Sequence, residues 1–337
     1  RNVAADRMLA GTHLVPRQAA ELNGETVLLE VETTQSGIHV AMAARTRSFA
    51  GAQRFDPFRR LVTDDGGRVA HELAFAVERG RPVTVEKVVV VSTSRDRAIA
   101  SPAAAAATWM QRLPDPTEMQ AEHERGWQIL WDEFAVEIRG TQEMSLALNL
   151  NTFHVLQTVA AVDTDLDAGL PARGLHGEGY RGHVFWDEMY VYPILTLRRP
   201  DLSRALLGYR YRRLNEARAL AQAAGHRGAM FPWQSGIDGR EVTPSELFNT
   251  RSGQWMPDYS HNQRHVGLAI AYSVWQYYHS TGDADFLKHQ AAEMLLEIAR
   301  FFADLTTYDE AADRFDIDGA MGPDEFHDGY PGTPGQG

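Results

Sequence analysis

The chain has 337 residues, of which 44% are hydrophobic and 23% are charged, and its formal net charge is -12. That charge argues against a nucleic-acid-binding protein, which needs a basic surface. The absence of cysteine excludes disulfide bonds and thiolate metal sites. No apolar run is long enough to span a bilayer, and residues 1–10 lack the pattern of a signal peptide, so we expect a cytoplasmic protein without membrane contact.

The first 100 residues have the composition of β-strands. Segments rich in Val, Ile, Leu and Thr are separated by short turns, at residues 26–33, 38–49, 68–78 and 83–94. Alternation in the third segment places His71, Leu73, Phe75 and Val77 on its buried face. Strands at this spacing without intervening helices predict an antiparallel β-sandwich over residues 1–100, incomplete at its N-terminal end.

Residues 101–140 change to a helical pattern. Ser101 and Pro102 precede a run of alanines and mark a helix start, with Ser as the N-cap. The Pro-Asp-Pro sequence at 114–116 interrupts this helix, and a second one is expected over 117–131. We interpret this stretch as a helical linker.

Residues 141–337 keep the helical period. Helices are expected over 141–162, over 201–224 with Asp201 as cap and Gly225 as stop, and over 265–281 with Gly282 as stop. Asp283 then caps a further helix. Long loops separate them, at 163–183, 225–263 and 306–337, and loops of this length usually carry a site. The pattern indicates a helical barrel or toroid that needs more helices than the chain supplies, so we expect a fragment of a longer polypeptide.

The richest loop covers residues 171–190. Four glycines allow close backbone approach, and Trp186 lies next to Asp187. An indole packs on the C–H face of a sugar ring while a carboxylate accepts hydrogen bonds from its hydroxyls, so this pair suits a sugar site. The alternative is an Arg and Asp pair that only ties down the loop.

Two further loops contain candidate ligand groups. Phe231 to Gly236 combines aromatic residues with the amide of Gln234, although the same residues could form a buried corner. His261 and His265 are four residues apart, as zinc ligands on a helix can be. Since no third ligand accompanies them, we expect no metal and favour a capping or substrate-contacting role.

The segment 321–327 contains the candidate acid Glu325. It follows a Gly-Pro-Asp turn, and burial or the neighbouring Asp324 would raise its pKa toward that of a general acid. The alternative is a solvated acidic turn.

Four motifs together resemble glycoside hydrolase family 65. They are RGHVFWDE (181–188), FPWQSG (231–236), ARFF (299–302) and MGPDEFH (321–327). The resemblance implies an N-terminal β-sandwich, an (α/α)6-barrel catalytic domain over 141–337 that is incomplete at its C-terminal end, and inverting phosphorolysis of an α-linked glucose disaccharide to β-glucose 1-phosphate. Inorganic phosphate would be the co-substrate without any cofactor, and a homodimer is implied by the resemblance alone.

The resemblance also assigns roles to residues. Glu325 becomes the general acid, and Trp186 and Asp187 are placed at the nonreducing glucose. The other expected substrate-binding residues belong to these motifs or to the loop before residue 265: Arg181, His183, Glu188, Trp233, Gln234, His265, Asp324 and His327. The phosphate-binding segments are expected beyond Gly337. An inverting α-glucoside hydrolase or a noncatalytic carbohydrate-binding protein are the alternatives.

Overall fold

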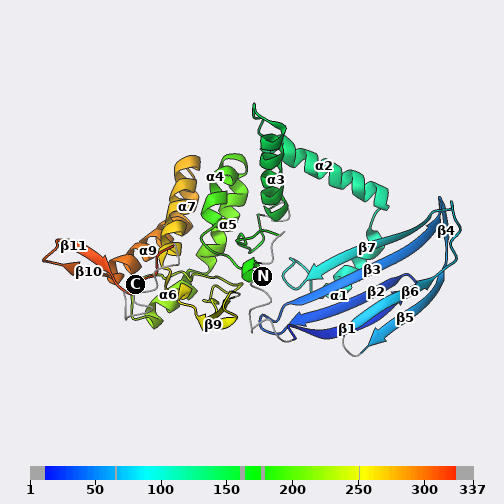
Figure 1. The fold of residues 1–337 in the computed structure, drawn as a ribbon, viewed down its shortest axis with the longest axis horizontal. Helices are drawn as coiled ribbons and strands as arrows, with labels where there is room; N and C mark the ends of the chain where they lie inside the picture. Colours follow the sequence, from blue (N-terminus) through cyan, green and yellow to red (C-terminus); the bar gives the residue numbers. More distant parts are fainter. Residues whose placement is uncertain (1–11, 65–66, 160–163, 176–178, 250, 324–337) are drawn as a thin grey trace. The chain divides into compact units, whose positions relative to one another are not determined.

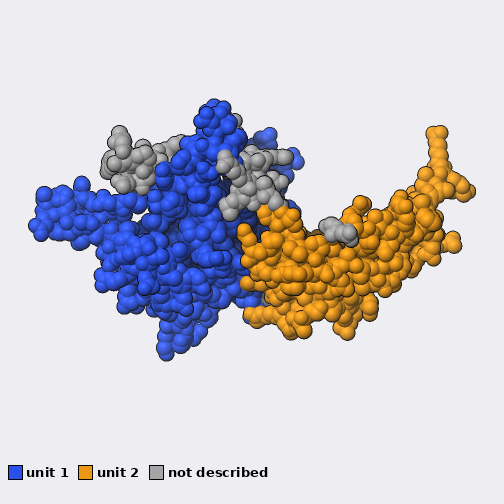
Figure 2. Space-filling view, turned by 90° about the horizontal axis from the view of Figure 1, so that it is seen from below, with its two compact units in different colours: residues 1–9, 129–337 blue, residues 10–128 orange. Residues whose placement is uncertain are grey.

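A computed structural model describes residues 12–64, 67–159, 164–175, 179–249 and 251–323. These residues form two compact units, one within residues 10–128 and one within residues 129–337 (Figure 2). The first in chain order, residues 10–128 (orange in Figure 2), contains mostly strands, and the second, within residues 129–337 (blue in Figure 2), contains mostly helices, in the order that the sequence predicts (Figure 1). The division between the units falls inside helix α2 (Pro116–Phe134), and the domain boundaries at residues 100 and 140 stay predictions.

The strand-rich unit is built on one antiparallel sheet. Its strands follow the order β1-β2-β3-β4, and β7 also pairs with β3. A separate antiparallel pair, β5 and β6, contacts β1 and β2. The bounds are β1 (Leu14–Asn23), β2 (Thr26–Thr33), β3 (His39–Ala50), β4 (Gln53–Phe55), β5 (Phe58–Asp64), β6 (Arg68–Ala74) and β7 (Val83–Thr93). The four predicted strands correspond to β2, β3, β6 and β7, and the arrangement fits a β-sandwich.

Helix α1 (Pro102–Arg112) covers one face of the main sheet (Figure 1). The Ser101 hydroxyl accepts a hydrogen bond from the Ala104 N–H at 3.3 Å, which confirms the predicted N-cap. Burial of apolar surface holds the helix on the sheet. The shared core consists of Ala103, Ala106 and Met110 of the helix with Leu28, Ala41 and Ala43 of the sheet. Helix α1 therefore belongs to the core of the β unit as well as linking the sheet to α2.

The predicted buried face of the third strand is right only in part. His71 and Leu73 are half-buried, while Glu72 and Ala74 are exposed. The alternation also predicts burial of Phe75 and Val77, but both are exposed, Val77 at 71%. The physical reason is that β6 ends at Ala74, so alternation no longer fixes the faces of the residues beyond it.

The second unit is helical, with short hairpins in its loops. Helix α4 packs against α5 and α7, and α9 packs against α6 and α7 (Figure 1). The helices are α3 (Gln142–Val159), α4 (Glu188–Arg198), α5 (Pro200–Arg212), α6 (Leu214–Ala223), α7 (His265–Thr281), α8 (Ala284–Phe286) and α9 (Ala292–Leu305), with a π-helical turn at Leu287–Ala291. The hairpins pair β8 (Glu246–Asn249) with β9 (Gln254–Pro257), and β10 (Thr306–Asp309) with β11 (Arg314–Ile317). None of the helices in the described ranges combines the length and apolar character needed to cross a membrane.

Helix α7 follows its predicted pattern closely. Val266, Ile270 and Val274 are buried at 2% exposure or less, as the spacing predicts. Gly282 ends the helix in the left-handed region, with φ of 67°. The Asp283 carboxylate accepts from the Phe286 N–H at 2.9 Å and caps the next helix, which confirms both end signals.

The prediction of one helix over 201–224 is wrong. The chain forms α5 and α6 with a break at Arg213, and Asp201 lies in the first turn of α5 instead of capping it. Its carboxylate pairs with Arg199 at 2.9 Å, and Arg199 itself occupies the N-cap position. The sequence patterns also predict loops where both hairpins form, and the predicted loop over 171–190 includes the first three residues of α4. The hairpin strands are too short to show a clear period. The (α/α)6 barrel stays a prediction.

Candidate active site

Three segments of the helical unit are joined by backbone pairing around Val184. The Val184 N–H donates to the Ser235 carbonyl at 3.0 Å, and the Ser235 N–H donates back at 2.9 Å. The Ala172 N–H donates to the His183 carbonyl at 3.2 Å. The glycine-rich loop and the 231–236 loop, some 50 residues apart, therefore meet as two of the predicted site loops.

The turn before Val184 is held in an unusual conformation. Tyr180 and Arg181 both have positive φ, at 60° and 54°, which costs energy for residues with a Cβ atom. An Arg181 terminal nitrogen donates to the Val242 carbonyl at 3.3 Å. Arg181 therefore binds the protein's own backbone, and its predicted contact with substrate stays a prediction.

His183 and Gln234 form a direct pair. The Gln234 amide nitrogen lies 2.5 Å from His183 Nδ1, which requires the imidazole to accept there. Burial, together with the positive charge of Arg181, lowers the pKa of His183 to about 4. His183 is thus neutral at pH 7 and suits hydrogen bonding to an uncharged hydroxyl better than pairing with an anion.

Trp186, Trp233 and His265 form an aromatic cluster. The imidazole lies edge-on to Trp186 with ring centres 4.7 Å apart, and 5.2 Å from the Trp233 ring. Burial lowers the pKa of His265, and both of its ring nitrogens are buried without a hydrogen-bond partner among the described residues. Three predicted site residues from three different segments therefore come together in this cluster.

Asp187 and Glu188 differ although they are neighbours. Asp187 is half-buried at the start of α4, and burial raises the pKa of its carboxyl against the opposing effects of its own backbone N–H and of Arg173. Glu188 is 4% exposed and accepts from Arg210 Nε at 2.7 Å. One oxygen of Glu188 is therefore already bound by Arg210. A direct role of Glu188 in substrate binding stays a prediction.

A cavity of about 290 Å³ opens beside these two carboxylates. Its walls are formed by one side of α3, the segment around Arg173 and the start of α4. The polar lining residues are Asn151, His154, Thr158, Arg173, Asp187 and Glu188. The volume is near the lower end of ligand pockets and suits one sugar unit, and the lining offers both donors and acceptors.

Glu241 has no role in the sequence motifs, but it holds the second loop. Its carboxylate accepts from the Trp233 N–H at 2.8 Å and from the Gln234 N–H at 3.2 Å. The Thr243 hydroxyl donates to the same group at 2.6 Å. Because the N–H groups of two successive residues donate to one carboxylate, Glu241 fixes the backbone orientation of Trp233 and Gln234.

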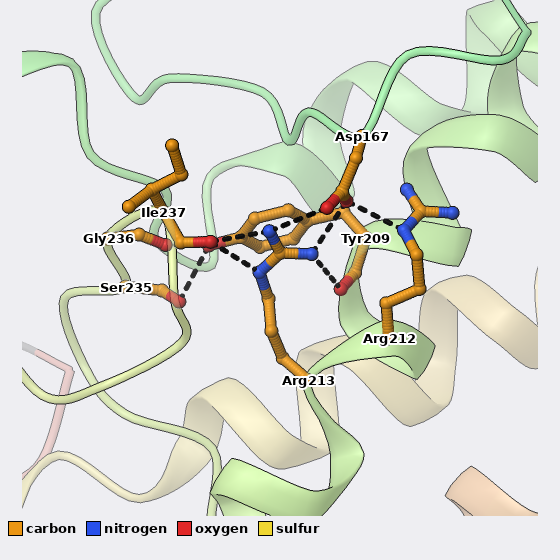
Figure 3. Close-up of polar contacts among 7 residues, drawn as sticks. All are labelled: Asp167, Tyr209, Arg212, Arg213, Ser235, Gly236 and Ile237. Atoms are coloured by element: carbon orange, nitrogen blue, oxygen red, sulfur yellow. Dashed lines mark hydrogen bonds and ion pairs between the residues drawn. The ribbon is translucent and has the colours of Figure 1, made fainter. Parts of the chain in front are cut away.

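Arg213 connects the loop that contains Ser235 and Ile237 to the segment around Asp167 (Figure 3). Its guanidinium donates to the Asp167 carboxylate at 2.7 and 3.0 Å and to the Ile237 carbonyl at 3.0 Å. It also lies 3.9 Å from the centre of the Tyr209 ring, and the Tyr209 hydroxyl reaches Ser235 Oγ at 2.8 Å. Partial burial acts to raise the pKa of Asp167, but the guanidinium groups of Arg213 and Arg212 outweigh it and lower that pKa to about 2.

The proposed acid and its neighbours are outside the described residues. These are Asp324, Glu325 and His327. The chain leading to them is anchored, because the Met321 N–H donates to the Asn262 carbonyl at 3.1 Å, three residues before His265. Among the described residues, no group of three or more His, Cys, Asp or Glu side chains could hold a metal ion.

Comparison with known families gives the class of protein. Residues 1–130 match the N-terminal domain of glycosyl hydrolase family 65, and residues 149–331 match the central catalytic domain of the same family. The chain belongs to glycosyl hydrolase family 65, as its four motifs predict.

Three individual relatives match most of the chain. The chain is 45% identical over 327 residues to an uncharacterized glycosyl hydrolase of Mycobacterium tuberculosis, which covers 97% of the chain and 24% of that protein. It is 33% identical to trehalose 6-phosphate phosphorylase of Lactococcus lactis and 35% identical to kojibiose phosphorylase of Caldanaerobacter subterraneus, covering 91% and 90% of the chain and 39% and 40% of those proteins. The chain therefore spans between about a quarter and two fifths of the length of these relatives.

A solved structure shows the same fold. It is described as "Putative kojibiose phosphorylase from human microbiome" and superposes with a TM-score of 0.76 at 19% identity, over 95% of this chain and 40% of that one. At this identity the likeness concerns the fold alone.

Proposed function

We propose that the full-length protein is an inverting phosphorylase that cleaves an α-linked glucose disaccharide and releases β-glucose 1-phosphate. The observation that carries this proposal is the half-buried Asp187 carboxylate in the wall of a cavity of about 290 Å³. Asn151 and Thr158 also line the cavity. Their nitrogen and hydroxyl donate to the Ala147 and His154 carbonyls of the same helix, so it is their oxygen atoms that suit the hydroxyls of a sugar as acceptors. Two relatives whose names state phosphorolysis, of trehalose 6-phosphate and of kojibiose, support this choice of reaction.

The sugar would be held by hydrogen bonds with Asp187 and His183 and by the ring of Trp186. Asp187 accepts hydrogen bonds from glucose hydroxyls, while the neighbouring Trp186 ring, held edge-on by His265, limits where the sugar can lie. His183 supplies a neutral imidazole because its pKa is lowered to about 4. We propose that further helices complete an (α/α)6 barrel around this site in the full-length protein.

The proposed reaction follows from charge. Glu325 protonates the glycosidic oxygen as the bond between that oxygen and the anomeric carbon breaks, and a phosphate oxygen attacks the anomeric carbon from the opposite face. Water would need a second carboxylate as base, at roughly 6.5–9.5 Å from the acid in an inverting hydrolase. Phosphate is already an anion, so the reaction needs cations and N–H donors to hold it. We place these donors in segments beyond Gly337.

The first experiment incubates the full-length protein with kojibiose, trehalose, maltose and trehalose 6-phosphate, each with and without phosphate. We expect β-glucose 1-phosphate to form only when phosphate is present. Release of free glucose without phosphate would establish a hydrolase instead, and β-glucose as the first anomer formed would show that it inverts. Binding of a disaccharide without any cleavage would indicate a noncatalytic carbohydrate-binding protein.

The acid is tested by Glu325→Gln in the full-length protein. The amide cannot donate a catalytic proton, so turnover should fall by at least ~10²-fold while disaccharide binding, measured by calorimetry, is retained. Glu310→Gln, at an exposed acidic residue in the turn between β10 and β11, serves as the matched control and should keep its activity. Retained turnover by Glu325→Gln would refute the assignment.

A further inference from the structure

The Trp186-Asp187 pair lies between two residues that are both bound by one arginine. Arg210 Nε donates to the Glu188 carboxylate at 2.7 Å, immediately after the pair. A terminal nitrogen of the same guanidinium donates to the Phe185 carbonyl at 2.9 Å, immediately before it. Arg210 therefore holds both ends of a four-residue segment whose two central residues are proposed to meet the sugar.

The arginine and both of its partners are buried. Arg210 is 1% exposed, and its two partners Phe185 and Glu188 are 2% and 4% exposed. It comes from α5, whose other buried residues include Leu206 and Leu207. Burying an ion pair among apolar groups is at best weakly favourable for stability compared with an apolar pair, so energy alone does not explain why an arginine occupies this position.

The shape of the guanidinium explains why an arginine, rather than another residue, occupies this position. Its donors lie in one plane at fixed angles, so two simultaneous bonds set both the distance and the orientation of Phe185 relative to Glu188. Glu188 is in the first turn of α4, whereas Phe185 precedes the helix. Fixing these two points sets the direction in which the chain enters α4, and Asp187 is the last residue before that helix.

We propose that Arg210 is a positioning residue, which orients Trp186 and Asp187 toward the sugar by holding the backbone on both sides of them. This inference rests on the proposed function for its kinetic part only. A lysine at this position keeps the positive charge opposite Glu188, but as a compact point donor it cannot reproduce the two-bond geometry. Charge and geometry can therefore be separated by one substitution.

The experiment compares Arg210→Lys with Arg204→Lys in the full-length protein. Arg204 is also in α5 and forms exposed ion pairs with Asp283 and Asp285, so it controls for loss of an arginine from this helix. For each variant, the thermal midpoint, the amide hydrogen exchange of residues 184–190 and the steady-state kinetics on the cleaved disaccharide are measured. Exchange over residues 265–281 is the internal reference.

For Arg210→Lys we expect faster exchange in residues 184–190 with the reference unchanged, and a thermal midpoint close to that of the parent. We also expect at least a tenfold fall in kcat/KM, mainly through a higher KM, because a misplaced Asp187 weakens sugar binding. Arg204→Lys should match the parent in all three. Parental exchange and kinetics in Arg210→Lys, or an equal loss in Arg204→Lys, would overturn the proposal.

The measurements distinguish a failure of the proposed function from a failure of the positioning role of Arg210. If the parent protein cleaves none of the disaccharides, the proposed function fails, and the exchange of residues 184–190 alone then decides the positioning role. If the parent is active and Arg210→Lys retains both its parental exchange and its KM, the positioning role fails while the proposed function stands.

Discussion

At Gly228 a loop runs directly against the backbone of α9. Gly228 has φ of 81°, and a Cβ atom there would lie 2.3 Å from the Glu297 carbonyl oxygen and 2.4 Å from the Phe301 nitrogen. The next residue, Ala229, donates its N–H to the same Glu297 carbonyl at 2.9 Å. The backbone of α9 therefore leaves no room for any side chain at Gly228.

We expect Gly228→Ala to lower the free energy of unfolding by about 2–4 kcal/mol, through steric overlap and positive φ together. Gly225→Ala is the matched control, because it has φ of 84° but nothing within 4 Å of the added carbon. It should cost only about 1 kcal/mol. Chemical denaturation of both variants measures the difference, and equal costs would show that the close approach does not matter.

Adjacent residues that line one cavity can also differ in burial and in the groups that bind them. Asp187 and Glu188 have similar chemistry in the sequence, and the family resemblance predicts that both bind substrate. The structure places Asp187 half-buried in the cavity wall and commits one oxygen of Glu188 to Arg210. The difference arises because Arg210 comes from another helix, 22 residues away, which no local pattern indicates.

At the scale of elements, the C-terminal end of α5 is tied to two loops by Arg213. We expect Arg213→Met to lower the free energy of unfolding by about 2–3 kcal/mol, less than a fully buried pair because Asp167 is partly exposed. Arg240→Met, which breaks an exposed pair with Asp238, is the control and should cost within about 0.5 kcal/mol. Chemical denaturation measures both costs, and an equal loss in the two variants would contradict the anchoring role of Arg213.

The same pair predicts a pH dependence. Since the pKa of Asp167 is lowered from 3.8 to about 2, its stabilising contribution is present above 3.8 and is lost as the pH falls toward 2. Arg213→Met should therefore reduce the slope of stability against pH in this window, measured by denaturation at several pH values. An unchanged slope would contradict the assignment.

The contact of α1 with the sheet gives another prediction at this scale. Met110 is 3% exposed and packs in the core with Leu28, Ala41 and Ala43, so Met110→Ala should cost about 2–4 kcal/mol. Trp109 precedes it on the same helix but is 57% exposed, and Trp109→Ala should change stability by less than about 1 kcal/mol. Thermal unfolding of the two variants tests this, and a larger loss for the exposed tryptophan would refute the described packing.

At the scale of the whole molecule, each compact unit has its own core. Leu28, Ala41 and Met110 belong to the core of the first unit, while Ala221, Met230 and Phe301 form a cluster in the second. Combining Met110→Ala with Gly228→Ala should therefore give additive losses within about 0.5 kcal/mol, because the two residues belong to separate cores. Calorimetry of the single and double variants measures this, and a coupling above about 1 kcal/mol would show that the two cores are energetically linked.

The sequence by itself determined the features that depend on residues close to one another along the chain. Strand-forming composition between turns located β2 and β3, and the helical period located α7. The end signals at Ser101, Gly282 and Asp283 were right, and four motifs identified the family. These features could be predicted because backbone geometry and capping involve residues only a few positions apart.

Only the tertiary structure decided how distant residues meet. It brought Trp186, Trp233 and His265 into one aromatic cluster. It also paired Glu188 with Arg210 and bound the Glu241 carboxylate to the backbone of the 231–236 loop. The physical reason is that burial and ion pairing depend on the packing of whole elements, and a buried arginine has no local pattern that distinguishes it from a solvated one.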